Sequence, residues 1–413
     1  MAIASREMRG GRSAGARQSR ALLVALGAAV WLACFPPTVL GATAYVDPTQ
    51  GSSLFYVASA GEANQVEVTR DGAGTTIRDP GAVITAGSGC TSVSPTEVFC
   101  AGSDTEAARV VLGDGDDAAA VVEGGGVVVL GGPGGDELNA CETCSALLSG
   151  GTGNDMLTGG DQAGLHGQEG ADTLIGDASL HGGPGSDSLT GNSDLRVMDG
   201  GRGDDTITGG DLGNHILPGS GDDTIAAGDG DDRVVLDKGE DNVDGGPGRD
   251  SVDLFRLWVP LMVDLRRDRA IVGGRRSLRI RLVSIADVRG TARSDRLIGD
   301  GHDNVLDGAG GQDELVGNGG DDVFRTGDGV VRPASSGLDD FLRGGAGDDL
   351  LQAGRGDDFL EGGSGEDRLE GQAGDDVILA RDGASDVVRG GRQLDRAGVD
   401  ASLDDVRDVE IFF

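Results

Sequence analysis

One large apolar side chain recurs every nine residues over residues 182–253 and again over residues 290–379, with glycine and polar residues between. The repeated phrase is Gly-Gly-x-Gly-x-Asp-x-U-x, in which U is apolar. Its cleanest copies lie at 131–139, 150–158, 182–190, 200–208, 344–352 and 362–370. Glycine at the first, second and fourth positions lets the first six residues turn, and the last three can form a short strand. Each unit is therefore predicted to be one turn followed by one strand.

The eighth residue of each unit is the predicted core position, because neighbouring side chains in a strand point to opposite faces. In the first stretch these residues are Leu189, Met198, Ile207, Ile216, Ile225, Val234, Val243 and Val252. In the second stretch they are Leu297, Leu306, Leu315, Phe324, Pro333, Leu342, Leu351, Leu360, Leu369 and Ile378. Pro333 belongs to a degenerate unit, 326–334, which is expected to bulge outward.

Two units should complete one coil of 18 residues, because each unit reverses the direction of the chain. Successive coils would then stack as parallel strands about 4.8 Å apart. The predicted fold class is all-β: a right-handed parallel β-roll, or β-solenoid, built from such coils and preceded by a small β-rich N-terminal cap.

Aspartates at the sixth position should stack along the edges of this roll. The 18-residue spacing places Asp187 with Asp205, Asp205 with Asp223, Asp232 with Asp250, Asp340 with Asp358 and Asp376, and Asp313 with Asp349 and Asp367. Carboxylates this close repel one another unless a cation lies between them, and calcium accepts irregular shells of six or more oxygens better than magnesium does. The predicted calcium ligands are Asp136, Asp155, Asp172, Asp187, Asp205, Asp223, Asp232, Asp241, Asp250, Asp295, Asp313, Asp322, Asp340, Asp349, Asp358, Asp367 and Asp376.

The alternative interpretation of these aspartates is that they only form turns, since Asp is common in glycine-rich turns. Several units also lack the acid, because Arg196, Asn214, Asn304 and Val331 stand at the sixth position. Calcium is expected to be weakly bound or absent at those four units.

The nonapeptide resembles the calcium-binding repeat of the RTX, or haemolysin-type, family of secreted bacterial proteins. The match holds in register through both long stretches, which chance does not readily produce. The resemblance implies a β-roll that takes Ca²⁺ as its cofactor, and it points to the same ion as the carboxylate columns do.

Composition agrees with a thin roll. The chain has 77 glycines and only 3% aromatic residues, which are too few large side chains for an ordinary globular core of this length. The formal charge is −36 at pH 7. Acidity alone often indicates disorder, but here the acids stand at the ligand position, which favours metal binding.

Residues 1–44 are predicted to be a signal peptide. Five arginines precede an apolar run at 21–34, and Ala42-Thr43-Ala44 offers a small-residue cleavage site, so the mature chain should start near Tyr45. The alternatives are an uncleaved anchor and, less favoured, a lipid on Cys34. Secretion is expected, with no membrane span after cleavage.

Four cysteines remain in the mature chain, an even number that favours disulfides in an exported protein. Cys90 with Cys100 would close a hairpin. Cys141 and Cys144 have the spacing of a redox motif but lie in a glycine-rich coil, so a plain disulfide is favoured over redox chemistry or zinc.

The other segments differ from the two arrays. Residues 45–110 are predicted to be the cap, with strands at 54–59, 65–69, 75–78 and 97–100. Residues 111–181 hold unevenly spaced units, where part of the calcium is expected to be lost.

Residues 254–289 carry nine Arg against three Asp and resemble the apolar interlude of RTX proteins. One interpretation is a coil without calcium, whose arginines offset nearby carboxylates. The other is a basic patch for an anionic glycan, nucleic acid or lipid. Residues 380–413 should form a C-terminal cap.

No enzyme is expected, because arrays and caps fill the mature chain and neither His-Glu-x-x-His nor Gly-x-Ser-x-Gly occurs. The favoured function is a structural or adhesive protein of the cell surface or matrix that folds on extracellular calcium. Extracellular polysaccharide or cell-envelope components are the expected partners, and nucleic acid is not. The alternative is a secreted carbohydrate-active enzyme whose site lies along a face of the roll.

Overall fold

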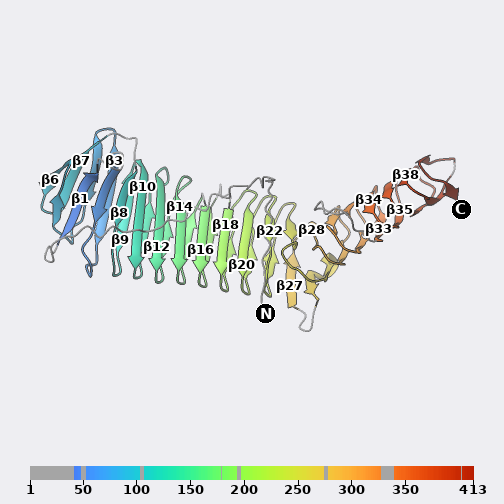
Figure 1. Cartoon of the computed structure of the whole chain (residues 1–413), viewed down its shortest axis with the longest axis horizontal. Helices are drawn as coiled ribbons and strands as arrows, with labels where there is room; N and C mark the ends of the chain where they lie inside the picture. Colours follow the sequence, from blue (N-terminus) through green and yellow to red (C-terminus); the bar gives the residue numbers. More distant parts are fainter. Residues whose placement is uncertain are drawn as a thin grey trace, which may run out of the picture. The chain divides into compact units, whose positions relative to one another are not determined.

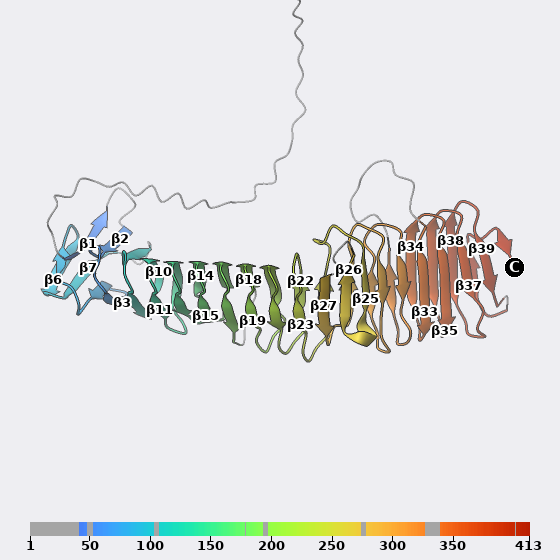
Figure 2. The same cartoon turned by 90° about the horizontal axis from the view of Figure 1, so that it is seen from below.

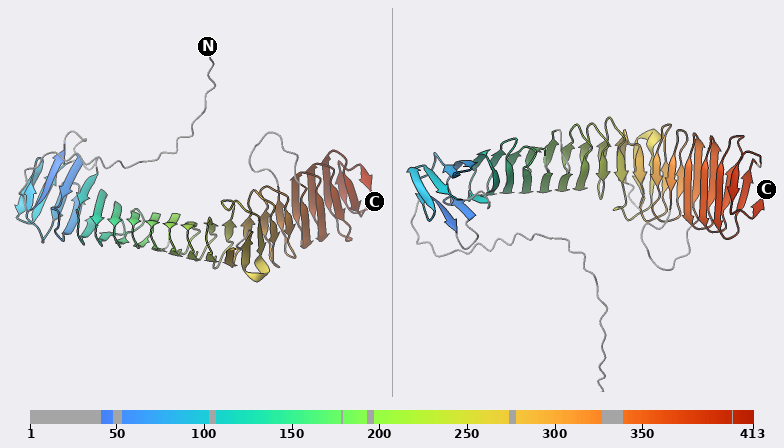
Figure 3. Two further views of the ribbon diagram at one scale, coloured as in Figure 1. Left: turned by 60° about the horizontal axis from the view of Figure 1, so that its bottom comes forward. Right: turned by 90° about the horizontal axis from the view of Figure 1, so that it is seen from above.

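The structure is a computed structural model that describes residues 41–47, 53–102, 107–177, 179–192, 197–273, 278–326, 339–400 and 402–413. These residues form an all-β solenoid of about 16 coils, as predicted (Figure 1). Figure 2 shows the short strands lying side by side from β10 to β39, and Figure 3 shows that they follow one another in the order of the sequence.

The strands form two sheets, and successive strands of the coils alternate between them. Sheet A contains β1 (Ala42–Asp47), β2 (Ser53–Val57), β5 (Ile84–Ala86), β8 (Ala108–Val111), β10 (Gly125–Pro133), β12 (Ser145–Thr152), β14 (Gly164–Glu169), β16 (Ser179–Pro184), β18 (Val197–Arg202), β20 (His215–Ser220), β22 (Arg233–Val235), β24 (Ser251–Asp253), β28 (Asp287–Arg289), β30 (Val305–Asp307), β32 (Val323–Arg325), β34 (Leu350–Arg355), β36 (Arg368–Ala373), β38 (Val387–Arg392) and β40 (Asp405–Arg407). Sheet B contains β3 (Gln65–Asp71), β4 (Gly74–Arg78), β6 (Cys90–Ser94), β7 (Glu97–Ala101), β9 (Ala118–Glu123), β11 (Glu137–Ala140), β13 (Met156–Thr158), β15 (Thr173–Gly176), β17 (Ser188–Gly191), β19 (Thr206–Thr208), β21 (Thr224–Ala226), β23 (Asn242–Asp244), β25 (Leu261–Asp264), β26 (Arg269–Val272), β27 (Leu278–Val283), β29 (Arg296–Ile298), β31 (Glu314–Val316), β33 (Phe341–Ala346), β35 (Phe359–Ser364), β37 (Val377–Ala380), β39 (Arg396–Val399) and β41 (Ile411–Phe412). A 3-10 turn, η2 (Leu265–Arg267), follows β25.

The core is a stack of single apolar side chains between the two sheets. In sheet B, Leu189 lies in register with Ile207, and Ile207 with Ile225, through parallel pairing. Every predicted core residue within the described ranges has no more than 1% of its surface exposed. Pro333 lies outside the described residues. One buried apolar residue per unit therefore suffices to hold the two sheets together.

Glycine at the second and fourth positions is required by the close stacking of the turns. Gly363 has φ +119°, and a Cβ there would lie 2.0 Å from the carbonyl oxygen of Gly345 in the preceding coil. Gly365 has φ +139°, and a Cβ there would lie 2.0 Å from the carbonyl oxygen of Gly347. Any larger residue in this conformation would force the coils apart.

The second array contains one step that is longer than 18 residues. Strand β31 pairs with β33 through Leu315 and Leu342, and β32 pairs with β34 through Phe324 and Leu351. Each of these partners is 27 residues apart, so one nine-residue unit does not contribute a strand to the stack. The unit predicted to bulge outward, 326–334, lies outside the described residues except for Thr326.

The N-terminal region is β-rich, and the four strands predicted for it correspond to β2, β3, β4 and β7. Strands β2 and β3 pair in parallel with β8 and β9, so the region continues both sheets. Strand β1 was not predicted. Its Ala42 and Ala44 are fully buried, so a cleavage after Ala44 would remove half of a packed strand. A mature start before Ala42 would preserve it.

The C-terminal region, residues 380–413, was predicted to be a cap, and its strands continue the two sheets of the roll. Strands β38 and β40 extend sheet A, and β39 and β41 extend sheet B, all by parallel pairing. The step from Asp376 to Asp395 is 19 residues, which obscured the period in the sequence. A longer turn absorbs the extra residue without changing the strand register.

Residues 254–289 also differ from the single coil predicted for them. In sheet A, β24 pairs directly with β28, but sheet B has three strands between them in the sequence where a regular coil has one. Strand β27 is parallel to β23, β26 is antiparallel to β27, and β25 is antiparallel to β26 and parallel to β29. Alternation of apolar and polar residues is the same for both strand directions, so the sequence pattern could not distinguish the two arrangements.

Both predicted disulfides are present. Cys90 and Cys100 are directly opposite each other on the antiparallel strands β6 and β7, and their sulfur atoms are bonded. Cys141 is bonded to Cys144 in the turn before β12. Neither pair has the helix N-terminus that stabilises a reactive thiolate, which favours a structural role for both.

Replacing Cys90 and Cys100 together by serine should loosen the cap hairpin and lower stability by about 2–3 kcal/mol, because the bond restricts the unfolded chain. Freed β6 and β7 edges should also promote association. Thermal unfolding and light scattering in calcium, with exposed Ser92→Ala as the control, would measure both effects. A double variant as stable and as monomeric as the control would contradict the capping role.

Candidate metal centres

The sixth-position aspartates form continuous ladders between coils. Asp187 shows the arrangement: its Oδ1 accepts a hydrogen bond from the backbone N–H of Asp172, and its own N–H donates to Oδ1 of Asp205, both at 2.8 Å. The N–H of Asp205 donates in turn to Oδ1 of Asp223, also at 2.8 Å. Each of these carboxylates is buried. One oxygen of every carboxylate therefore holds the stack together, and the second oxygen remains available.

The second carboxylate oxygen is buried and has no hydrogen-bond partner at most of these positions. The unpartnered Oδ2 atoms belong to Asp117, Asp136, Asp155, Asp172, Asp187, Asp205, Asp223, Asp232, Asp250, Asp313, Asp322, Asp349, Asp358, Asp367, Asp376 and Asp395. Buried polar atoms are nearly always paired, and a charged oxygen without a partner is especially unfavourable. A row of such atoms indicates that a cation belongs beside them.

Glycine at the first position keeps open the space in front of each unpartnered oxygen. The point where a Cβ would stand at Gly344 lies 2.2 Å from Oδ2 of Asp349 and 2.4 Å from the carbonyl oxygen of Gly362. At Gly317 the corresponding distances, to Asp322 Oδ2 and to the carbonyl oxygen of Gly344, are 1.9 and 2.6 Å. Carboxylate and carbonyl oxygens are the ligands that calcium prefers. The residues present therefore fit a calcium ion.

Each ion would take few carboxylates. Within the described residues, no three His, Cys, Asp or Glu side chains surround a common point. A calcium ion between two coils would therefore draw its remaining oxygens from backbone carbonyls of the turns. This donor set matches the glycine-rich composition of the repeat.

All seventeen predicted ligands lie in four columns. The first contains Asp117, Asp136, Asp155, Asp172, Asp187, Asp205, Asp223 and Asp241. The second contains Asn214, Asp232 and Asp250. The third contains Asp295, Asp313, Asp340, Asp358, Asp376 and Asp395. The fourth contains Asn304, Asp322, Asp349, Asp367, Asp386 and Asp404.

The predicted pairings hold except at Asp313. Its N–H donates to Oδ1 of Asp340 at 2.7 Å, so it does not share a column with Asp349, as the 18-residue spacing had suggested. Asp349 instead follows Asp322. One nine-residue unit does not contribute a strand to the stack. Every later aspartate therefore lies on the edge of the roll opposite to the one that the 18-residue spacing predicts.

Uneven coil lengths do not disrupt the first column, although part of its calcium was expected to be lost. The steps from Asp136 through Asp155 and Asp172 to Asp187 are 19, 17 and 15 residues, yet the ladder distances stay between 2.8 and 2.9 Å. The opposite edge of each coil absorbs the difference in length. Of the four units without the acid, Asn214 and Asn304 keep their places in the columns, and Arg196 and Val331 lie outside the described residues.

Four aspartates of the columns are absent from the predicted ligands: Asp117, Asp386, Asp395 and Asp404. The first three each precede a short strand with a buried apolar residue two positions later, a local signal that remains where the spacing is irregular. A second, exposed ladder was also missed. There the fifth-position carboxylate of Asp339 accepts from the N–H of Asp357, and that of Asp357 accepts from the N–H of Asp375.

Burial, followed by the repulsion of neighbouring carboxylates, raises the pKa of most column members. It raises the pKa of Asp313 and Asp349 to about 8. The pKa rises to about 7 for Asp205, Asp241, Asp322, Asp358 and Asp376. It rises to about 6 for Asp136, Asp172, Asp223, Asp250 and Asp386. At neutral pH a cation would therefore displace protons from the members whose pKa is about 7 or 8.

The calcium-free roll should be more stable in acid than at neutral pH. Because these folded-state pKa values exceed the ordinary value of about 4, the folded chain binds more protons than the unfolded chain between about pH 4 and pH 8. Its stability should therefore fall as pH rises through that window. Circular dichroism of the calcium-stripped chain at pH 5 and pH 8 would test this, with the calcium-loaded chain as the control. A β signal that increases with pH would contradict the expected sign.

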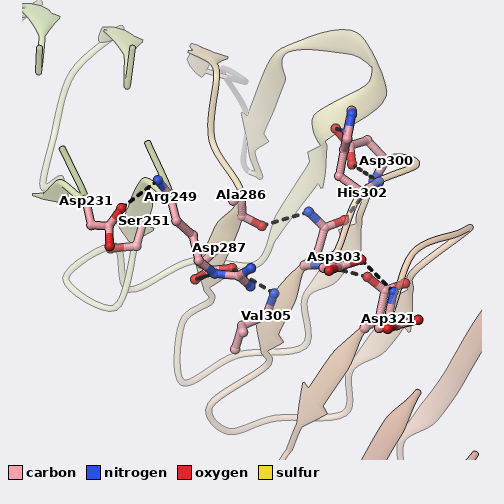
Figure 4. A network of polar contacts seen from close by, with 12 residues as sticks. Asp231, Arg249, Ser251, Ala286, Asp287, Asp300, His302, Asp303, Val305 and Asp321 are labelled. Carbon is pink, nitrogen blue, oxygen red and sulfur yellow. Dashed lines mark hydrogen bonds and ion pairs between the residues drawn. The ribbon is translucent and has the colours of Figure 1, made fainter. Parts of the chain in front are cut away.

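At the junction between the two arrays, an ion pair and a side-chain amide contact stand beside the aspartate ladder (Figure 4). Arg249 donates from Nη2 and Nε to the two carboxylate oxygens of Asp287, at 2.7 and 3.0 Å. Asp287 also accepts from the N–H of Val305, and Asn304 donates to the carbonyl oxygen of Ala286. Within residues 254–289, Nη1 of Arg289 lies 3.6 Å from Oδ2 of Asp253 and its Nε lies 3.5 Å from Oδ2 of Asp307, so this arginine offsets neighbouring carboxylates as the first interpretation expects.

The comparisons agree with this geometry. A family model for four copies of the RTX calcium-binding nonapeptide repeat matches residues 147–163, 176–207, 197–211, 218–252, 287–315, 298–330, 336–369 and 361–396. No curated protein matches the chain. The matched segments leave out all three strands β25, β26 and β27 of sheet B. Between residues 147 and 396, the chain therefore carries RTX calcium-binding nonapeptide repeats in the matched segments.

Proposed function

We propose that the protein is an exported β-roll that folds on extracellular calcium and serves as a structural or adhesive component of the cell surface or matrix. The observation that carries the proposal is the row of buried carboxylate oxygens without partners along the roll. Calcium would neutralise them, and because the sites are absent from the unfolded chain, binding energy would become folding energy. Low intracellular and high extracellular calcium would then restrict the folded state to the outside.

The described residues support a structural rather than a catalytic function. Strands and turns of the roll account for these residues, and the carboxylates recur in nearly every coil instead of converging on one centre. In the ranges that the structure describes, no helix has the length and apolarity needed to cross a membrane. The predicted signal peptide, 1–44, lies almost entirely outside those ranges, and export remains part of the proposal.

The calcium-loaded protein should bind acidic or neutral polysaccharides of the cell envelope without cleaving them. A panel of purified polysaccharides, with binding read by sedimentation and cleavage read by reducing ends, would separate the two activities. Chelated protein is the control, since unfolding should abolish binding. Cell fractionation with N-terminal sequencing would test export. Retention of the chain inside the cell would contradict the proposal.

A carbohydrate-active enzyme is the second candidate, and one cleft favours it. A cavity of about 480 Å³ is lined by Glu314, Asp339, Arg296 and the ring of Phe341, among others. Arg296 Nη2 lies 3.2 Å from Oε1 of Glu314. Two carboxylates beside an aromatic ring are suited to a sugar. Cleavage of any polysaccharide by the wild type, lost in both Glu314→Gln and Asp339→Asn, would favour this function over the structural one.

A further inference from the structure

A basic patch lies on the outer face of sheet B, across β26 and β27, which lie side by side in Figure 2. Arg269 of β26 and Arg279 and Arg281 of β27 are exposed. The residues that alternate with them, Ala270 and Ile280, are buried. The alternation of strand side chains therefore places the three guanidinium groups on one outer surface, and we name these three residues the arginine patch.

The pairing of β26 and β27 sets two like charges against each other. Arg269 and Arg281 are direct partners in the antiparallel register of these strands. In β33 and β35 of the same sheet, by contrast, Arg343 is the register partner of Glu361, and its Nη2 lies 2.7 Å from Oε2 of that glutamate. Like charges directly opposite each other destabilise a sheet, so the stability of the roll does not account for Arg269 and Arg281.

The arginine patch has no carboxylate partner among the described residues. Arg281 donates from Nη1 to the side-chain amide oxygen of Asn242 at 3.2 Å, which leaves its charge unpaired. Neither Arg269 nor Arg279 forms an ion pair within the described part of the chain. Three exposed guanidinium groups are therefore open to a ligand.

The acid in register with Arg269 is already neutralised. Asp264 of β25 is the register partner of Arg269 on the other side, and its carboxylate lies 3.0 Å from Nε of Arg266 and 2.8 Å from Nη1 of Arg267. Two cations thus surround this one anion, and the arginine patch adds three more. In a chain with a formal charge of −36, such a local excess of positive charge points to an anionic ligand.

Apolar and aromatic groups border the arginine patch. Ile271 of β26 and Met262 of β25 are register partners on the same outer face. The carbonyl oxygen of Pro260 accepts the N–H of Gly273 at 2.7 Å, which brings the turn that carries Trp258 to the end of β26. The side chain of Trp258 is 71% exposed. Apolar carbons and an exposed indole ring beside cations suit a sugar chain, whose C–H faces pack on such groups while its acidic groups meet the cations.

We propose that the arginine patch binds a linear polysaccharide that bears carboxylate groups. This inference rests on the proposed function and adds to it the class of ligand and the site. Planar guanidinium groups match carboxylates bidentately, and a carboxylate between Arg269 and Arg281 would relieve their repulsion. A nucleic acid suits the surface less well, because its denser charge would be repelled more strongly by the acidic columns of the roll.

The test uses the full mature chain in millimolar calcium, with hyaluronate as the carboxylated probe and dextran as the neutral one. Titration of fluorescently labelled polysaccharide should show tighter binding of hyaluronate, and that binding should weaken as sodium chloride is added. Arg269→Gln, Arg279→Gln and Arg281→Gln should each weaken it by about fivefold. Arg343→Gln is the matched control, because it removes one exposed cation from the same sheet, and it should bind as the wild type does.

The outcomes separate the site from the broader function. Weaker hyaluronate binding by the three variants, with an unchanged β signal and with wild-type binding by the control, supports the proposal. Equal binding by the variants and the wild type overturns it, and so does a wild type that binds dextran as well as hyaluronate; the proposed function stands in both cases. Tighter binding of anionic lipid vesicles or DNA, lost in the same variants, overturns the class of ligand.

Absence of binding to any polysaccharide would overturn the adhesive function itself, and the site with it. The preference of the wild type for hyaluronate over dextran requires no substitution. The proposal therefore stays open to contradiction even if a variant fails to fold.

Discussion

Removal of calcium at neutral pH is expected to unfold most of the chain beyond the N-terminal cap. The protein carries a formal charge of −36, and its columns hold buried carboxylates whose second oxygens have no partner. Without a cation these groups must either take up protons or separate. With only one apolar layer per coil to oppose that repulsion, separation should prevail at pH 7. The β signal in circular dichroism should largely disappear in chelator and return in millimolar calcium.

A residual β signal from the N-terminal cap and a magnesium control show whether the loss of signal reports calcium-dependent folding of the roll. The cap has a denser apolar core, including fully buried Tyr56 and Ile77, and its own disulfide, so a residual β signal should persist after chelation. Magnesium at the same concentration is the control, because its demand for regular octahedral geometry suits these turns poorly. A full β spectrum in chelator at neutral pH would show that the carboxylates only shape the turns.

The repeated positions could be predicted from the sequence because both the core and the ligands follow the nine-residue period. Leu189 and Asp187 illustrate the two classes: each recurs in register through both arrays, and each lies where the period placed it. The core position follows from the alternation of strand side chains. The ligand position follows from the repulsion that stacked carboxylates would otherwise suffer.

The remaining features depend on pairings that the period does not encode. Asp313 changed column because one unit leaves the stack, and nothing in the local sequence fixes which edge the next strand joins. The local sequence also does not fix the direction of β26. This strand is antiparallel to its neighbours, but its apolar stretch would fit a strand of either direction. Asp395 kept its place although its step is one residue too long. Backbone pairing and the core fix the register, and the turns accept the differences in length.

Replacing Asp358 by asparagine should weaken the calcium response of the second array, whereas the same change at Asp357 should not. Asp358 lies in a column between Asp340 and Asp376, so its second oxygen can serve ions on both sides. Asparagine keeps the oxygen that accepts the N–H of Asp340, but it puts an amide group in place of the unpartnered Oδ2. Because calcium affinity depends on the number of ligand charges, the calcium midpoint of folding should rise roughly tenfold.

Asp357 provides the matched control, since it is the neighbouring acid, is exposed, and also accepts a backbone N–H through Oδ1. Both substitutions remove one negative charge, so a general electrostatic effect would alter the two proteins alike. Asn304→Ala is a further control, because Asn304 occupies a column position but carries no carboxylate, and its amide donates to a carbonyl. It can lower stability but should leave the number of bound ions unchanged. Isothermal titration would measure the number of bound ions, and calcium-dependent circular dichroism would measure the calcium midpoint of folding. Equal losses in Asp358→Asn and Asp357→Asn would mean that calcium is held by total charge and not by the buried oxygens of the columns.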